Sequence, residues 1–232
     1  MAVDETDDLR SSSSSLLRSQ HDLSDVLAPI KLPCGATLPN RLVKAALCEH
    51  LASLFGGPPN PSHLALYSRW ASGSWGIIIS GNVQVSPRHL TLGRDIVLPP
   101  TLNERALQPF TQLAQAIHGF YSQHRTLAIM QLSHAGRQSP LLLGGRLPFV
   151  PASAPSPIPL GRQSHNEGWL ARSFYRLMFQ TPRQMSPEDI ETTIEDFMRG
   201  ATAALASGFD GVELHASHGC MLFRFGLFSS LT

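Results

Sequence analysis

Residues 208–219, near the C-terminus, constrain the fold of this chain more than any other stretch. A long helical pattern ends at Gly208, and a short apolar strand is predicted over residues 211–215. Two histidines, His215 and His218, stand where that strand ends. In an α/β barrel, side chains at the C-terminal ends of the strands point into the mouth of the active site. Two imidazoles at such a mouth could donate paired hydrogen bonds to one substrate oxygen, or bind a metal ion.

Strands and helices alternate along the rest of the chain. Strands are predicted over residues 40–48, 75–80, 126–132 and 211–215, and helices over residues 60–73, 104–118 and 186–208. This alternation implies a parallel sheet with right-handed crossovers. No Gly-x-Gly-x-x-Gly turn follows a strand and the sequence has no Gly-Lys-Ser/Thr loop, which argues against a dinucleotide-binding sheet and against an ATPase.

The last helix has the clearest local signals. Ser186 is a favourable N-cap, Pro187 suits the first turn, and Asp189 follows three residues after the cap. The apolar residues that follow have the spacing of one helical face. They are Ile190, Ile194, Phe197, Met198, Ala201 and Leu205.

Other segments have weaker signals. Residues 77–79 form a β-branched run, which predicts a buried strand in a sheet covered on both faces. Residues 30–38 contain a Pro-Cys-Gly turn and predict a small hairpin at the barrel floor. Residues 81–103 are predicted to be a loop. The proline-rich residues 133–184 form a long connection, typical of functional lids or binding loops, with weak helical character over residues 168–179.

Length and charge exclude several classes of function. The chain has 232 residues, which suits one domain with a sizeable core. A formal net charge of +1 gives no reason to expect nucleic acid or an anionic membrane as a partner. No apolar run approaches the roughly 18 residues that span a bilayer, and the N-terminus resembles neither a secretory signal nor a transit peptide. Three scattered cysteines do not form a disulfide framework, so we expect a soluble, cytoplasmic protein.

The first residues differ in composition from the rest. Residues 1–24 are polar and serine-rich, with too little apolar surface to offset the entropy of ordering, and they predict a disordered tail. A phosphorylated regulatory arm is the functional alternative. The folded part is predicted to span residues 25–232.

Five motifs, taken in order, resemble those of one enzyme family. They lie at residues 38–46, 75–83, 130–140, 151–154 and 208–219. In these motifs the chain is similar to the old yellow enzyme family, the FMN-dependent NADH:flavin oxidoreductases, and most of all to a fungal branch of it. The resemblance implies an α/β fold of the (β/α)8 TIM-barrel type. It also implies FMN as cofactor, NADH or NADPH as reductant, and a small activated alkene such as an enone as substrate.

The resemblance also implies which residues contact the flavin. They are Ala45, Ala46, Leu47, Cys48, Asn82 and Gln131. The Cys48 thiol could hydrogen-bond the flavin and tune its potential, although most cysteines in such positions are simply buried. The Gln131 amide offers a donor and an acceptor, which suits the pyrimidine edge of the flavin. Without the resemblance, Gln131 would be interpreted as a polar residue that caps the core.

His215 and His218 match the pair that binds the carbonyl oxygen of the alkene in this family. Their catalytic role would be to stabilise the negative charge that builds on that oxygen. His50 stands where one branch has a substrate-contacting tyrosine. Zinc is disfavoured because the two histidines lie on an extended segment without a clustered third ligand, so no metal is predicted. The alternative is that His215 and His218 are ordinary polar residues at a strand end, without a role in catalysis.

The chain departs from the family pattern in two ways. Cys220 stands where the family has the tyrosine that protonates the substrate, and Ala46 replaces a common proline. A thiol is a shorter donor, so we expect protonation by solvent or weak alkene reduction.

The second departure is length. A (β/α)8 barrel needs eight units and about 250 residues, whereas four strands are predicted here. We therefore expect the N-terminal half of a barrel, from a truncated product or an incomplete gene model, without the family's phosphate-binding loops. Such a half leaves sheet edges open, so we expect self-association through the open edge and weak or no FMN binding. The alternative function is a non-catalytic half-barrel.

Overall fold

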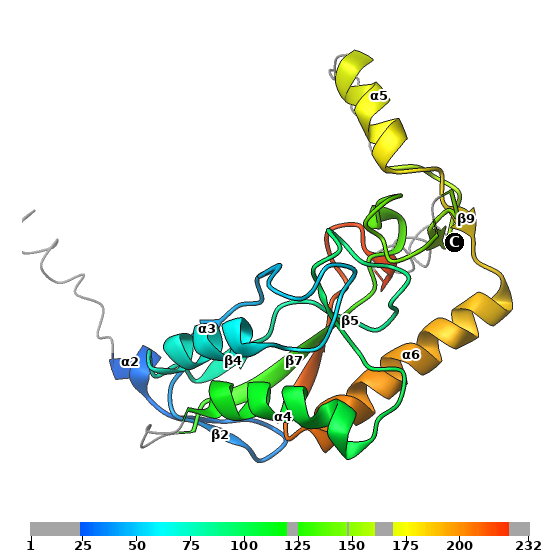
Figure 1. Cartoon of the computed structure of the whole chain (residues 1–232). Coiled ribbons are helices and arrows are strands. Elements are labelled where there is room, and N and C mark those ends of the chain that lie inside the picture. The colour runs from blue at the N-terminus through cyan, green and yellow to red at the C-terminus, as the bar shows by residue number, and fades with distance from the viewer. Residues whose placement is uncertain (1–23, 120–124, 148, 161–168, 223–232) are drawn as a thin grey trace, which may run out of the picture.

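The computed structural model describes residues 24–119, 125–147, 149–160 and 169–222 (Figure 1). Its centre is a parallel sheet with four strands in chain order. They are β3 (Val43–Lys44), β4 (Ile77–Ile79), β7 (Leu127–Ser133) and β10 (Gly211–Leu214). Each strand pairs in parallel with the next, and Glu213 of β10 lies opposite Gln131 of β7. The predicted order of parallel strands is confirmed, although β3 and β4 are shorter than predicted.

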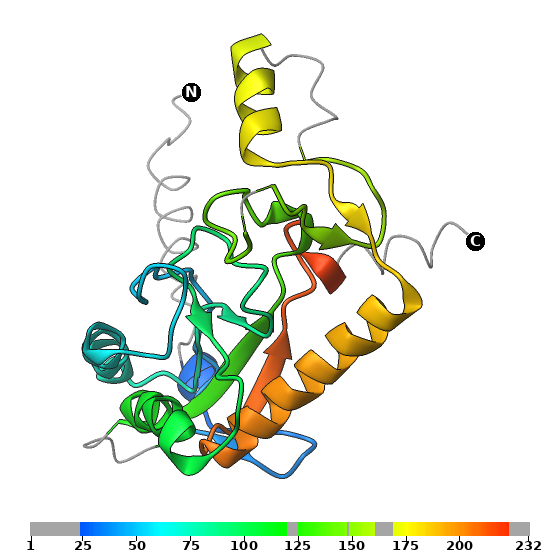
Figure 2. The same cartoon turned by 45° about the vertical axis from the view of Figure 1, so that its right-hand side comes forward.

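Three helices connect these strands and pack together on one side of the sheet (Figure 2). They are α3 (Pro61–Ala71), α4 (Glu104–His118) and α6 (Pro187–Ala206). The core between helices and sheet includes Tyr67, Ile78, Phe110 and Met130, all fully buried. Residues on this side of the strands alternate with residues that face the opposite, barrel-lumen side.

The helix starts follow from their caps. The side chain of Asn60 accepts the N–H groups of Ser62 and His63 at the start of α3. At the start of α6, Ser186 Oγ accepts the Asp189 N–H at 3.2 Å, and Asp189 Oδ2 accepts the Ser186 N–H at 2.8 Å. The predicted capping box is therefore confirmed, and it fixes where α6 begins relative to the sheet.

The N-terminal elements precede the sheet. A short helix, α2 (Ser24–Leu27), is followed by β1 (Ile30–Lys31) and β2 (Thr37–Leu38), which pair antiparallel. The predicted hairpin is confirmed. Of the segment predicted to be a disordered tail, residues 1–23 lie outside the described residues.

The two predicted loops contain regular structure. Within residues 81–103, β5 (Val83–Gln84) pairs with the end of β7, and β6 (Ile96–Val97) pairs with β5. The prediction of a plain loop there is wrong, because the chain resumes pairing with β7 after a break at residues 80–82. Within residues 133–184 lie four further elements. They are η1 (Gly136–Gln138), β8 (Ser153–Ala154), α5 (Trp169–Met178) and β9 (Arg183–Gln184), of which β8 and β9 pair in parallel.

The predicted apolar face of α6 is not its buried face. Ile194, Met198 and Leu205 are 51%, 65% and 78% exposed. The helix instead turns Gly200 and Ala203 toward the sheet. A Cβ at Gly200 would lie 2.9 Å from Leu132 Cδ2, so the close approach of helix and strand selects small residues there.

The lumen side of the sheet is only partly covered. Ile78 is fully buried, but Ile77 and Ile79 are half-buried and Val43 is 45% exposed. The prediction that this strand is covered on both faces is therefore wrong for the described residues. None of the helices in the described ranges combines the length and apolar character needed to cross a bilayer.

Candidate active site

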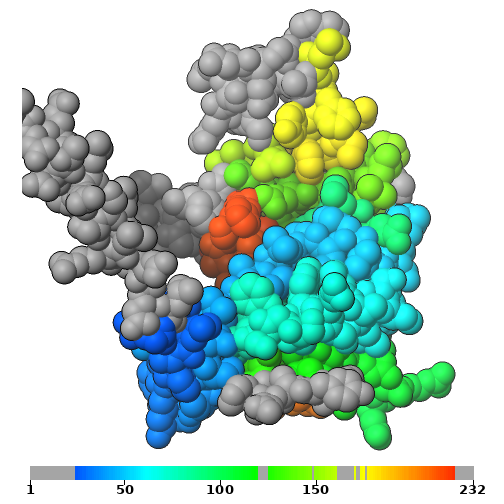
Figure 3. All heavy atoms as spheres, turned by 90° about the vertical axis from the view of Figure 1, so that its left-hand side faces the viewer, coloured from blue at the N-terminus to red at the C-terminus, as the bar shows by residue number. Residues whose placement is uncertain are grey.

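A cavity of about 290 Å³ lies at the C-terminal ends of the parallel strands. Its lining comes from the segment after β3, the break after β4, the loop between β5 and β6, β7 itself, η1, and the segment after β10. The lining residues are Ala46, Leu47, Cys48, His50, Asn82, Thr91, Leu92, Gln131, Gln138, His215, His218 and Cys220. Figure 3 shows the segment after β10, in orange-red, against the light-blue segment after β3. We call this the barrel-mouth cavity.

A buried group of hydrogen bonds ties the segment after β3 to the end of β4. The Tyr67 hydroxyl donates to the Glu49 carboxylate. The Gly81 N–H lies 2.6 Å from the Tyr67 oxygen and 3.1 Å from Glu49 Oε1. Burial and the negative charge of Glu49 raise the pKa of Tyr67, so its hydroxyl keeps the proton that it donates. Cys48 is thereby held at the cavity, where its Sγ accepts from Asn82 Nδ2 at 3.0 Å.

Replacing Gly81 with alanine should disturb this arrangement. A Cβ at this position would overlap the Glu49 carboxylate and the carbonyl oxygen of Leu47. We expect the free energy of unfolding to fall by about 1–3 kcal/mol, because overpacking forces the backbone to move. Urea denaturation measures the loss. Gly57→Ala is the matched control, since a Cβ there meets its nearest atom at 3.5 Å; an equal loss in both variants would contradict the prediction.

Gln131 is fixed from both its backbone and its side chain. Its N–H donates to Ser80 Oγ at 3.0 Å, and its Nε2 donates to Glu213 Oε1 at 2.7 Å across the β7–β10 pair. The side chain is 4% exposed. Because a carboxylate can only accept, Glu213 determines which end of the amide is the nitrogen. Among the described residues, none donates a hydrogen bond to Oε1 of Gln131, which leaves an acceptor and one N–H for a ligand.

The two histidines after β10 face one another. His218 Nδ1 and His215 Nε2 are 3.3 Å apart, and the ring planes meet at 41°. Burial, and next the neighbouring His218, lower the pKa of His215, so this ring is neutral at neutral pH. Two nitrogens at this separation can both lie within hydrogen-bond distance of a single acceptor oxygen.

The turn after His218 is held by a residue of the third motif. Gln138 Nε2 donates to the His218 carbonyl oxygen, and Gln138 Oε1 accepts from Cys220 Sγ at 3.4 Å. Burial raises the pKa of Cys220 to about 11, so it is a protonated thiol at neutral pH. Gln138 therefore positions both the second histidine and the thiol.

Nearly all the predicted site residues line this cavity. Ala45 is the exception: it is exposed and does not line the cavity, whereas the next three residues, Ala46, Leu47 and Cys48, do. Thr91, Leu92 and Gln138 also line the cavity and were not predicted. Gln138 lies inside a recognised motif and could have been found, whereas no sequence signal marks the other two. Within the described residues, no three His, Cys, Asp or Glu side chains are grouped closely enough to hold a metal ion.

Comparison with known proteins agrees with this architecture. The sequence profile of the NADH:flavin oxidoreductase / NADH oxidase family matches residues 25–230. The chain belongs to this family. The fold predicted from the sequence, an α/β fold of the (β/α)8 TIM-barrel type with about four β/α units, is confirmed.

Individual members of the flavin oxidoreductase family align with most of the chain. It is 42% identical over 198 residues to the NADH-dependent flavin oxidoreductase iliE of Neonectria sp. (strain DH2), covering 85% of this chain and 25% of that protein. It is 38% identical over 196 residues to iccE of Talaromyces variabilis, a protein of the same description. That alignment covers 84% of this chain and 46% of that protein. The crystal structure of an old yellow enzyme from Pichia sp. AKU4542 superposes with a TM-score of 0.67 at 25% identity. The superposition covers 87% of this chain and 48% of that enzyme. The chain thus spans about half or less of the length of these relatives.

Proposed function

We propose that this chain provides the flavin- and substrate-contacting residues of an FMN-dependent NAD(P)H oxidoreductase that reduces an activated alkene such as an enone. One observation carries the proposal. Cys48, Asn82, Gln131 and the His215–His218 pair come from four strand ends and line one cavity. The family membership and the names of the relatives support the same class of reaction.

The polar groups of the cavity fit a flavin ring. Gln131 presents an acceptor and a donor, as the pyrimidine edge of a flavin requires. The Asn82–Cys48 pair adds an amide and a protonated thiol to the lining of the same cavity. Bound FMN would supply the hydride for the reaction. The role of these residues would be to hold the ring and to set its electronic environment.

The histidine pair would act on the substrate. A carbonyl oxygen placed between His215 Nε2 and His218 Nδ1 can accept from both when each nitrogen carries its proton. Both donors would gain strength as negative charge develops on that oxygen, which lowers the barrier. His50 and the Cys220 thiol line the same cavity, so either could contact the substrate.

The open sheet favours a second proposal, a half-barrel that associates. In the described part of the chain, β3 and β10 have no partner on their outer sides. Val212 and Leu214 of β10 are 40% and 54% exposed. A second copy related by a twofold axis along the barrel would place β10 of one copy beside β3 of the other, with all strands parallel. Eight strands would then close the sheet and remove its edges.

Flavin retention tests the main proposal. The purified chain is mixed with FMN, desalted and examined by visible absorbance, while light scattering reports whether it is a monomer or a dimer. We expect the monomer to retain little FMN and a dimer that closes the sheet to retain more. Gln131→Leu should reduce retention relative to the control Gln115→Leu on the exposed face of α4. A folded chain that retains no flavin as monomer or dimer would contradict the proposal. A dimer without flavin would support the association module instead.

A further inference from the structure

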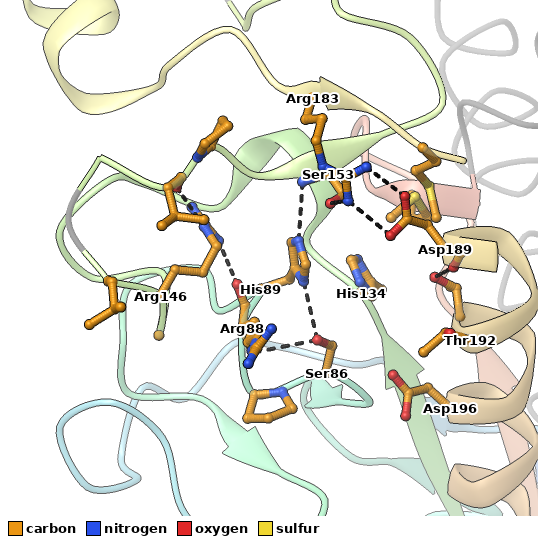
Figure 4. Close-up of a pocket in the computed structure, with 18 of the residues that line it drawn as sticks. Ser86, Arg88, His89, His134, Arg146, Ser153, Arg183, Asp189, Thr192 and Asp196 are labelled. Carbon is orange, nitrogen blue, oxygen red and sulfur yellow. Dashed lines mark hydrogen bonds and ion pairs between the residues drawn. The ribbon is translucent and has the colours of Figure 1, made fainter. Parts of the chain in front are cut away.

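A larger cavity, of about 840 Å³, lies outside the barrel mouth (Figure 4). It is bounded by the loop after β5, the residue that follows β7, the loop around Arg146, and the first turns of α6. It shares no lining residue with the barrel-mouth cavity. Its volume falls in the range of small-molecule sites, about 300–1,000 Å³. We call it the outer cavity.

Two stacked histidines line the outer cavity. The rings of His89 and His134 have centroids 4.2 Å apart and planes 32° apart. His89 Nε2 accepts the Ser153 N–H at 3.2 Å, so its proton is on Nδ1, which donates to Ser86 Oγ at 3.1 Å. Ser86 Oγ also receives the Arg88 N–H at 3.4 Å. With both lone pairs engaged, the Ser86 hydroxyl is left to donate its own proton.

His134 provides a second unused donor. Its Nδ1 accepts the Gly136 N–H at 3.1 Å, so its proton is on Nε2. The residue is 3% exposed, and no described residue partners its Nε2. Because His134 lines the outer cavity, an acceptor on a bound ligand could take this N–H. In Figure 4 the His134 ring stands beside His89 at the cavity.

The charges around the two rings favour an anion. Asp189 is paired with Arg183 at 2.7 Å, and Asp196 with Arg199 at 3.2 Å, so both carboxylates of the cavity are neutralised. Arg88 is exposed, and its guanidinium has no partner among the described residues. Arg88 lies between Ser86 and His89 in the sequence, so it places an unpaired positive charge beside these two residues.

The rest of the lining is apolar. Phe55, Leu142, Val150, Met185 and Met221 contribute side chains to the outer cavity. Burial lowers the pKa of His134 to about 4, so the polar end presents neutral donors beside Arg88. The Arg146 guanidinium adds a second positive charge to the lining, but its N–H groups are bound to carbonyl oxygens and to Ser139 Oγ. A ligand that matches both ends has an apolar body and a single anionic head.

We propose that the outer cavity binds an organic monocarboxylate with an apolar body. Its carboxylate would accept from His134 Nε2–H and Ser86 Oγ–H beside the Arg88 guanidinium. The apolar body would lie against the leucine, valine and methionine side chains of the lining. This is a binding site separate from the proposed flavin chemistry and does not depend on it.

Isothermal titration calorimetry of the full chain with octanoate tests this site. We expect saturable binding of one octanoate per chain, with 1-octanol at least about 10-fold weaker because it lacks the charge. Ser86→Ala and Arg88→Gln should each weaken octanoate binding by about 10-fold or more. Arg69→Gln, on the exposed face of α3, is the matched control and should bind as the unmodified chain does.

A third variant separates ligand binding from folding. His134→Asn can keep an acceptor for the Gly136 N–H while removing the Nε2 donor, and it should also weaken binding. Circular dichroism verifies that each variant is folded. Octanol binding as tight as octanoate would overturn the proposal, as would unchanged affinity in Ser86→Ala and Arg88→Gln or no saturable binding at millimolar octanoate. No flavin is needed, so the result is independent of the flavin-retention test.

Discussion

Alanine at either His215 or His218 should slow NAD(P)H-driven enone reduction by about 100- to 1,000-fold. The two ring nitrogens lie 3.3 Å apart, so each variant removes one of two donors to the same oxygen. The corresponding loss is about 2.7–4 kcal/mol of transition-state stabilisation. Steady-state kcat/KM, measured in a preparation that retains FMN, gives the effect. Reduction of the flavin by NAD(P)H should be unchanged, since neither histidine is assigned to that step.

Asparagine at position 218 is the informative control. His218 has a φ of 55°, a left-handed conformation that asparagine tolerates better than alanine. His218→Asn therefore preserves the backbone and retains an N–H donor, and it should recover part of the rate lost in His218→Ala. Equal rates in the two variants would show that the donor is not what matters. Unchanged kcat/KM in both alanine variants would remove the histidines from the mechanism.

The parts of this fold that could be predicted from sequence rest on local chemistry. The Ser186–Asp189 capping box depends only on residues within one turn, and it occurs in the structure. Strand order followed from the alternation of strand and helix, because right-handed crossovers leave few alternatives. The convergence of His215 and Gln131 at one cavity followed from the motifs and from the strand ends they occupy.

The parts that could not be predicted depend on distant contacts. The Tyr67–Glu49–Gly81 group joins three segments, and nothing in its local sequence indicates that a core tyrosine would meet that carboxylate. Glu213 was interpreted only as part of a strand, yet it orients Gln131 across 82 positions of sequence. The buried face of α6 was misjudged because hydrophobic periodicity marks large residues, whereas the close approach at Gly200 requires small ones.

Acid should destabilise the chain in a pH range set by its buried histidines. Burial lowers the pKa of His134 from 6.5 to about 4, and burial together with His134 also lowers the pKa of His89. Between pH 4 and pH 6.5, His134 is protonated in the unfolded chain but not in the folded chain. The free energy of unfolding is therefore greatest above pH 6.5 and falls as the pH decreases toward 4. His134 alone should account for about 3 kcal/mol of that fall.

Urea denaturation of the unmodified chain and of His134→Asn, each above pH 6.5 and near pH 4, measures this contribution. The variant retains an acceptor for the Gly136 N–H but cannot titrate, so its unfolding free energy should decrease less steeply with acid. Carboxylates such as Asp189, whose pKa is lowered by its hydrogen bond to Arg183, contribute equally in both chains and cancel from the comparison. If the unfolding free energy fell equally with acid in the two chains, protonation of His134 would not destabilise the folded state. That result would be incompatible with the buried, neutral ring on which the outer cavity's donor arrangement depends.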